Sequence, residues 1–187
     1  MNESRSSDYI LGILKNMNLI TVIYISGLMS YCLSGYIREN SALAFMGKIN
    51  VMPIAAWKIP LISVGLYCCC LLFLYIQNVN NLELFFKVFL ELGISFCISY
   101  VIGFSYTGIV LLVLADAMRY FPKSKWKFSF AIIICLFYML TDYNLISVYF
   151  RVTPLETYLE YFQNDTRAIL MGIKNALVSL NVSIFLV

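Results

Sequence analysis

Six long apolar stretches, separated by short polar segments, account for most of the 187-residue sequence. Each has about the length of the roughly 20 apolar residues that an α-helix needs to cross a bilayer. The pattern therefore predicts an all-α, polytopic bundle of about six transmembrane helices in a single transmembrane domain. The expected helices span 17–37, 59–77, 84–103, 105–121, 128–150 and 168–187.

The third and fourth stretches are separated only by the few residues between Phe104 and Gly108. They form either a tight helical hairpin or one long broken helix. We favour the hairpin, because a continuous helix of about 38 residues would exceed a hydrocarbon core about 30 Å thick. Gly103 and Gly108 are the residues that could supply the turn.

The composition indicates that lipid, rather than water, surrounds most of the chain. The chain is 61% hydrophobic and 12% charged, and its mean hydropathy is +0.84, whereas a soluble domain is about 25% charged. So few charges cannot cover a surface that faces water. The net charge of +3 is small and spread along the chain, so we expect the lipid bilayer and no nucleic acid as a partner.

Basic residues in the short loops predict the orientation. The densest group lies between the fourth and fifth stretches and comprises Arg119, Lys123, Lys125 and Lys127. This loop is expected on the cytoplasmic side of a cell membrane, which puts both termini in the cytoplasm and the 38–58 and 151–167 loops outside. The apolar run that reaches Val187 without a charged stop suggests a membrane part of a longer protein.

Residues for catalysis or metal binding are scarce. The sequence has no histidine, which removes the commonest general base and metal ligand. The six cysteines lie in apolar runs and are expected to be small buried hydrophobic residues. Three of them are consecutive, at 68–70, and point to three different helix faces. We therefore expect no enzyme activity, no cofactor and no metal in this chain.

Charged residues inside apolar helices are costly, so each is expected to have a partner. Glu83, Lys87 and Glu91 are spaced by four and can pair along one helix face. Asp116 and Arg119 are three apart in the fourth stretch. These local ion pairs need no functional explanation.

Asp142 and Lys174 have no opposite charge three or four residues away in their own stretches. Both are expected at similar depth below the outer face, which predicts an interhelical Asp142–Lys174 pair, joined by Asn144 and Asn175. One interpretation is a structural link between neighbouring helices. The other is a sensing or ligand-contact role.

Two segments carry a family resemblance: SYTGIVLLVLADAMRYFPKSKWKF, from Ser105 to Phe128, and TDYNLISVYF, from Thr141 to Phe150. They resemble the N-terminal multi-pass membrane region of bacterial two-component sensor histidine kinases. The resemblance implies a homodimeric sensing and anchoring input module in the bacterial plasma membrane, which passes helix rearrangements to a cytoplasmic output domain. Every kinase element is absent from residues 1–187.

Two other function classes stay open. A small-molecule transport component, such as the substrate-binding subunit of an importer, also has about six helices in about this length. A membrane enzyme is less favoured because histidines are missing. For the sensor, the signal could be a small molecule, a peptide, a lipid or membrane stress.

Overall fold

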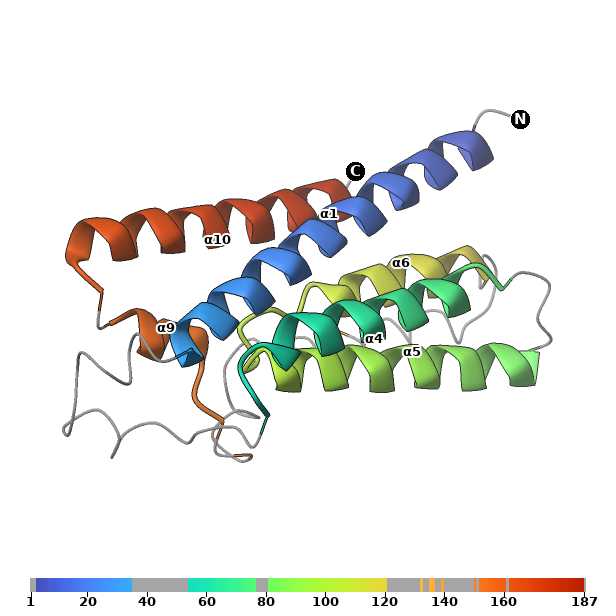
Figure 1. Ribbon diagram of the computed structural model, residues 1–187. Coiled ribbons are helices and arrows are strands. Elements are labelled where there is room, and N and C mark those ends of the chain that lie inside the picture. The colour runs from blue at the N-terminus through green and yellow to red at the C-terminus, as the bar shows by residue number, and fades with distance from the viewer. Residues whose placement is uncertain are drawn as a thin grey trace.

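The computed structural model describes residues 3–34, 54–76, 81–120, 152–160 and 162–186, together with positions 132, 135, 136, 139 and 150. These residues form helices and their connections, with no strand among them, as the all-α prediction requires. Figure 1 shows the long helices packed lengthwise against one another.

Six helices have described bounds, and most of the predicted stretches correspond to one of them. They are α1 Glu3–Leu33, α4 Lys58–Leu74, α5 Asn81–Val101, α6 Ile109–Tyr120, α9 Leu155–Leu159 and α10 Asn164–Leu186. Of the predicted helix at 128–150, the five described positions are helical and the others lie outside the described residues. The short helix α9 was not predicted.

Three of these helices are long and apolar enough to cross a membrane: Tyr9–Leu33 within α1, Glu83–Val101 within α5, and α10. Helices α4 and α6 are apolar but shorter. The most apolar window of α10 is only 11% buried within the chain, against 39% for α1 and 44% for α5. Helix α10 therefore presents most of its apolar surface to the surroundings.

Helix α1 occupies the centre of the arrangement, with α10 on one side and α4 on the other (Figure 1). Helix α4 packs in turn on α5, and α6 contacts α1, α5 and α10. Helices α1 and α5 run in one direction, and α4, α6 and α10 run in the opposite direction. We call the end that carries α9 the α9 end, and the other end, near which α1 begins, the opposite end.

The connection between α5 and α6 is a tight turn, so the two helices are separate, as the hairpin prediction states. Gly103 has a φ of +68°. The Phe104 amide donates to the Ser99 carbonyl at 2.6 Å, and the Gly103 amide donates to the Tyr100 carbonyl at 3.1 Å. This pair of bonds is a Schellman motif, which ends a helix and satisfies its last carbonyls.

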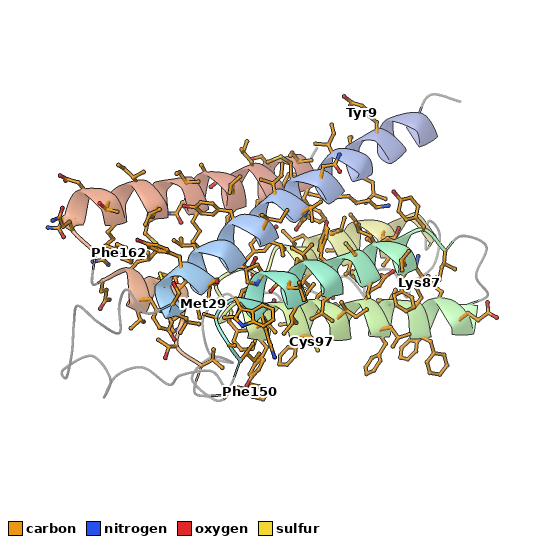
Figure 2. The ribbon with its side chains drawn as sticks, viewed as in Figure 1. Tyr9, Met29, Lys87, Cys97, Phe150 and Phe162 are labelled. Atoms are coloured by element: carbon orange, nitrogen blue, oxygen red, sulfur yellow. The ribbon has the colours of Figure 1, made fainter. Side chains whose placement is uncertain are left out.

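The main core lies between α1, α4, α5, α6 and α9 and is apolar. Val22, Ile25 and Met29 from α1 are fully buried against Tyr67 and Cys70 of α4 and their neighbours. At the α9 end, the ring of Phe150 lies 5.7 Å from that of Phe96 and 6.1 Å from that of Tyr100. These aromatic contacts place the end of the predicted 128–150 stretch beside the end of α5 (Figure 2).

Candidate functional site

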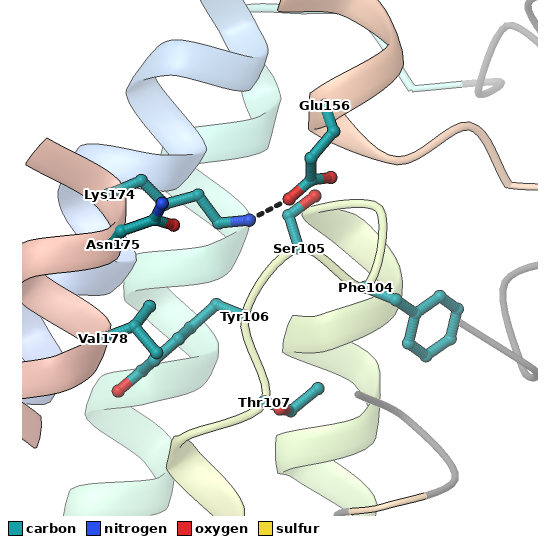
Figure 3. A pocket seen from close by; sticks show the side chains of 8 residues that line it. All are labelled: Phe104, Ser105, Tyr106, Thr107, Glu156, Lys174, Asn175 and Val178. Atoms are coloured by element: carbon teal, nitrogen blue, oxygen red, sulfur yellow. Dashed lines mark hydrogen bonds and ion pairs between the residues drawn. The ribbon is translucent and has the colours of Figure 1, made fainter. Parts of the chain in front are cut away.

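A polar pocket lies at the α9 end of the chain, between α9, α10 and the segment that joins α5 to α6. Its volume is about 170 Å³. We call it the Lys174 pocket, and Figure 3 shows the side chains that line it. They are Phe104, Ser105, Tyr106, Thr107, Glu156, Lys174, Asn175 and Val178.

An ion pair crosses the pocket from α10 to α9. The Lys174 ammonium donates a hydrogen bond to Glu156 Oε1. The Lys174 side chain is 10% exposed and that of Glu156 is 36% exposed (Figure 3). The pair is therefore partly open to the pocket rather than sealed in the core.

The sequence predicted a different partner for Lys174. Asp142 and Asn144 lie outside the described residues, so the Asp142–Lys174 pair stays a prediction, and the partner that the structure gives Lys174 is Glu156. Asn175 lines the same pocket and is otherwise exposed. Two of the four predicted polar residues are thus at one site.

Hydroxyl groups form the wall opposite α10. Ser105 and Thr107 are 7% and 4% exposed and belong to a non-helical segment in which every residue is buried. The Ser105 hydroxyl accepts a hydrogen bond from the Leu155 amide at 2.9 Å, which fixes the start of α9. In lipid, such irregular backbone is tolerated only where protein or a polar cavity surrounds it.

Tyr106 connects this wall to the central helix. Its hydroxyl donates to the Oδ1 atom of Asn18 on α1, and Asn18 is fully buried. The Ser99 hydroxyl of α5 donates to the Tyr106 carbonyl at 3.1 Å. The pocket wall is therefore held by two helices, whereas the ring of Phe104 points away from the ion pair (Figure 3).

Helix α10 is joined to α1 by two further polar contacts. The Tyr24 hydroxyl donates to the Leu170 carbonyl at 3.0 Å. The Asn181 side-chain amide donates to the Thr21 hydroxyl at 2.8 Å, and both residues are buried. Such side-chain bonds between helices contribute about 0.6 kcal/mol each on average in membranes, so they add modestly to the apolar packing of α10 on α1.

A second group of charges is buried towards the opposite end, where Figure 2 labels Lys87. We call Lys87, Glu91 and Asp116 the Lys87 cluster. The Lys87 ammonium lies 2.8 Å from Asp116 Oδ2 and 3.7 Å from Glu91 Oε1. It also donates to the Ile76 carbonyl, just beyond α4, at 3.2 Å. The three charged residues are at most 4% exposed.

The predicted local pairs are thus found only in part. Lys87 and Glu91 do pair along α5, but the shorter contact of Lys87 is to Asp116 on another helix. Glu83 is exposed. The side chain of Arg119 lies outside the described residues, as do Lys123, Lys125 and Lys127 of the predicted cytoplasmic loop.

The cysteines are less buried than expected. Cys32 and Cys70 are buried, whereas Cys68, Cys69, Cys97 and Cys135 are exposed on the surfaces of their helices. Within the described ranges, no group of three or more metal-ligating side chains comes together.

Sequence reasoning missed Glu156, Ser105 and Thr107. Glu156 was assigned to an outer loop, and no local spacing connects it with Lys174, which is 18 positions away. The interrupted apolar run around Gly103 was the available signal for the two hydroxyl residues, because it marks non-helical backbone next to a pocket.

Comparison with known proteins identifies no relative: no protein-family model, no curated protein and no solved structure matches the chain. The functional conclusion therefore depends on the sequence and on this geometry.

Proposed function

We propose that this chain is a polytopic membrane module that binds a small polar molecule in the Lys174 pocket and responds by moving α10. The proposal has two parts: the helices cross a membrane, and the Lys174 pocket binds a ligand. Three long apolar helices, two shorter ones and an exposed apolar surface on α10 support the first part.

The single observation that carries the second part is the Lys174–Glu156 pair in a partly open polar pocket. One ammonium, one carboxylate, hydroxyls and an amide can together bind a molecule that carries both charges, such as an amino-acid-like zwitterion. Each of its charged groups would replace one half of the existing pair, so no charge in the pocket would lose its partner.

The position of Lys174 suggests how binding is transmitted. It lies ten residues into α10, or about 15 Å along the helix axis. A ligand that separates Lys174 from Glu156 removes a link between α10 and α9, and α10 is otherwise held to α1 by few polar contacts. Occupancy would then bias α10 between two positions, which is how a membrane module can pass a signal.

The finer features of the sensor prediction are part of this proposal. They are a bacterial plasma-membrane location, cytoplasmic termini, a homodimer and a cytoplasmic output domain of a histidine kinase. The resemblance of 105–128 and 141–150 to sensor kinases supports them. Catalysis by the chain forms no part of the proposal.

The test uses the chain reconstituted in lipid nanodiscs and the common amino acids as zwitterionic probes. At least one probe is expected to raise the unfolding temperature of the wild type, because a ligand at 100 times its Kd stabilises the folded state by about 2.7 kcal/mol. Lys174→Met should abolish this shift. Lys58→Met, at an exposed residue that does not line the pocket, should preserve it. A panel without any shift, or an equal shift in Lys174→Met, would contradict the proposal.

A transport component is the second candidate, and one observation favours it. The buried non-helical segment at 102–108 lies beside the pocket, and broken helices of this kind surround the substrate sites of many transporters. Uptake of a stabilising probe into sealed liposomes distinguishes the two functions. A sensor binds the probe without moving it across the bilayer.

A further inference from the structure

Glu91 is a buried carboxyl group that the proposed function does not use. It lies in the middle of α5 and is 0% exposed. Among the residues that the structure describes, neither of its carboxyl oxygens has a hydrogen-bond partner. An ionised carboxylate in such surroundings loses its hydration and gains little in return.

The nearest positive charge, the Lys87 ammonium, has shorter contacts with other groups. The Lys87 ammonium lies 3.7 Å from Glu91 Oε1 but 2.8 Å from Asp116 Oδ2, and it also binds the Ile76 carbonyl beyond the end of α4. Helix ends of this kind carry partial negative charge. Lys87 therefore already compensates one full and one partial negative charge.

Among the described residues, the other elements packed around Glu91 supply no closer cation. Helix α1 contributes Lys15, a more distant charge held 4.4 Å from the centroid of the Tyr75 ring. Helix α4 contributes the Cys70 thiol, and α6 contributes Asp116, whose charge repels that of Glu91. Helix α10 has no charged residue after Lys174. Within the part of the chain that the structure describes, the Glu91 and Asp116 carboxyl groups thus share the Lys87 ammonium.

We propose that Glu91 is a proton-binding site. Its carboxylate takes one proton from water to become a neutral carboxylic acid, and Lys87 with Asp116 remains as a neutral ion pair. The buried cluster then has no net charge, which a low-dielectric interior favours. The proposal is independent of the Lys174 pocket, because Glu91 lies about 15 Å along α5 from the turn at that end.

A proton suits this site better than a metal ion. The Lys87 ammonium already occupies the position between the two carboxyl groups, where a cation shared by them would bind. A proton needs only one carboxyl oxygen and no further ligands. Sodium therefore serves as a competing occupant in the test.

Loss of the proton has a structural consequence. An ionised Glu91 attracts Lys87 within α5 and competes with Asp116 on α6. The contact between the two helices is then weakened at the end away from α9. The proton acts as a ligand that favours the tightly packed arrangement of α5 and α6.

The test measures the protonation state directly by infrared spectroscopy of the whole chain in lipid nanodiscs at neutral pH. A protonated carboxyl group absorbs separately from a carboxylate. The wild type is expected to show this absorption, and Glu91→Gln is expected to lose it. Glu83→Gln, at an exposed position on the same helix, should retain it. Replacing choline with sodium should leave it unchanged.

A second variant tests whether protonation of Glu91 depends on the competition of Asp116 for Lys87. In Asp116→Asn, Lys87 is left with Glu91 as its carboxylate partner, so Glu91 is expected to ionise and the absorption to disappear. Thermal unfolding gives an independent measurement: Glu91→Gln should leave the unfolding temperature at neutral pH unchanged, since glutamine closely mimics a protonated glutamate.

Several outcomes would overturn the proposal. The wild type could lack the absorption of a protonated carboxyl group, the Glu91→Gln variant could keep it, or sodium could abolish it in the wild type. Alternatively, Glu91→Gln could lower the unfolding temperature as much as Asp116→Asn does. The last result would mean that Glu91 is an ionised partner of Lys87.

Discussion

Gly103 is the residue on which the turn between α5 and α6 depends. Its φ of +68° is unfavourable for any residue with a side chain, and an added Cβ would lie 2.8 Å from the Thr153 carbonyl oxygen. Gly103→Ala is therefore expected to lower the free energy of unfolding by at least about 1 kcal/mol. Unfolding in mixed detergent micelles measures the change.

The matched control is Gly93→Ala, in the middle of α5. A Cβ at Gly93 meets no atom within 4 Å, so this change should be neutral or stabilise the helix by up to about 1 kcal/mol. Equal effects of the two alanines would show that the turn does not require glycine.

Tyr158 is a buried residue of α9 whose ionisation should affect alkaline stability. It is 1% exposed, and burial raises the pKa of its hydroxyl to about 12. In the unfolded chain the pKa is about 10, so the unfolded state releases the proton first. The stability that Tyr158 contributes is therefore fully present below about pH 10 and is lost as the pH rises towards about 12.

This prediction can be measured by chemical unfolding at about pH 8 and about pH 11. Between these conditions, Tyr158→Phe should lose about 1–2 kcal/mol less than the wild type. Tyr9→Phe, at a residue that is 72% exposed, should behave as wild type does. An identical alkaline loss in Tyr158→Phe would contradict the assignment.

For individual residues, the sequence predicted contacts within a helix better than contacts between helices. Lys87 and Glu91 could be paired because four residues bring side chains onto one helix face. The shorter Lys87–Asp116 contact depends on how α5 and α6 pack, which spacing does not encode. Lys174 could be identified as a charge that needs a partner, but the identity of Glu156 depends on the fold of a segment assigned to a loop.

The helices were predicted more accurately than their ends. Apolar runs located α4, α5, α6 and α10 because hydrophobicity marks the buried or lipid-facing part of each helix. Helix α1 begins at Glu3 rather than at 17. Its first turns are polar but contain no proline, so the helix continues beyond the apolar part. Helix α6 begins at Ile109 rather than at 105, because the left-handed φ angles of Gly103 and Phe104 turn the chain before it.

Helix α4 offers a test of the membrane environment at the scale of one element. Cys68 and Cys69 are exposed on its surface, whereas Cys70 is buried. If lipid covers this surface, a charged water-soluble maleimide should label neither exposed cysteine in nanodiscs, and an apolar maleimide should label both. Mass spectrometry identifies the modified residues.

Two comparisons define this experiment. Ser34→Cys introduces an exposed thiol directly after α1 and should react with the charged reagent. Cys70 should resist both reagents until the chain is unfolded. Rapid labelling of Cys68 by the charged reagent in nanodiscs would show that water, not lipid, covers α4.

For the whole molecule, the described helices are arranged as alternating crossings of a bilayer would require. Helices α1 and α5 run opposite to α4, α6 and α10 (Figure 1). In a bilayer crossed by these helices, the Lys174 pocket would lie towards one face and the Lys87 cluster nearer the other. The sequence predicted successive crossings from its apolar stretches and their orientation from loop charges, whereas the separation of the two polar sites along α5 comes from the structure.

The last prediction concerns which face of the membrane each site approaches. The basic residues at 119–127 predict that the end of α6 is cytoplasmic, and the end of α9 should then be outside. A reporter that is active only in the cytoplasm should work when fused after Lys127 and fail when fused after Glu160, and a reporter active only outside should show the reverse. The Lys174 pocket would then lie towards the outer face, where an external solute can reach it, and Glu91 would exchange its proton on the cytoplasmic side. Outside activity after Lys127 would reverse both assignments, because the direction of every helix is fixed relative to α6.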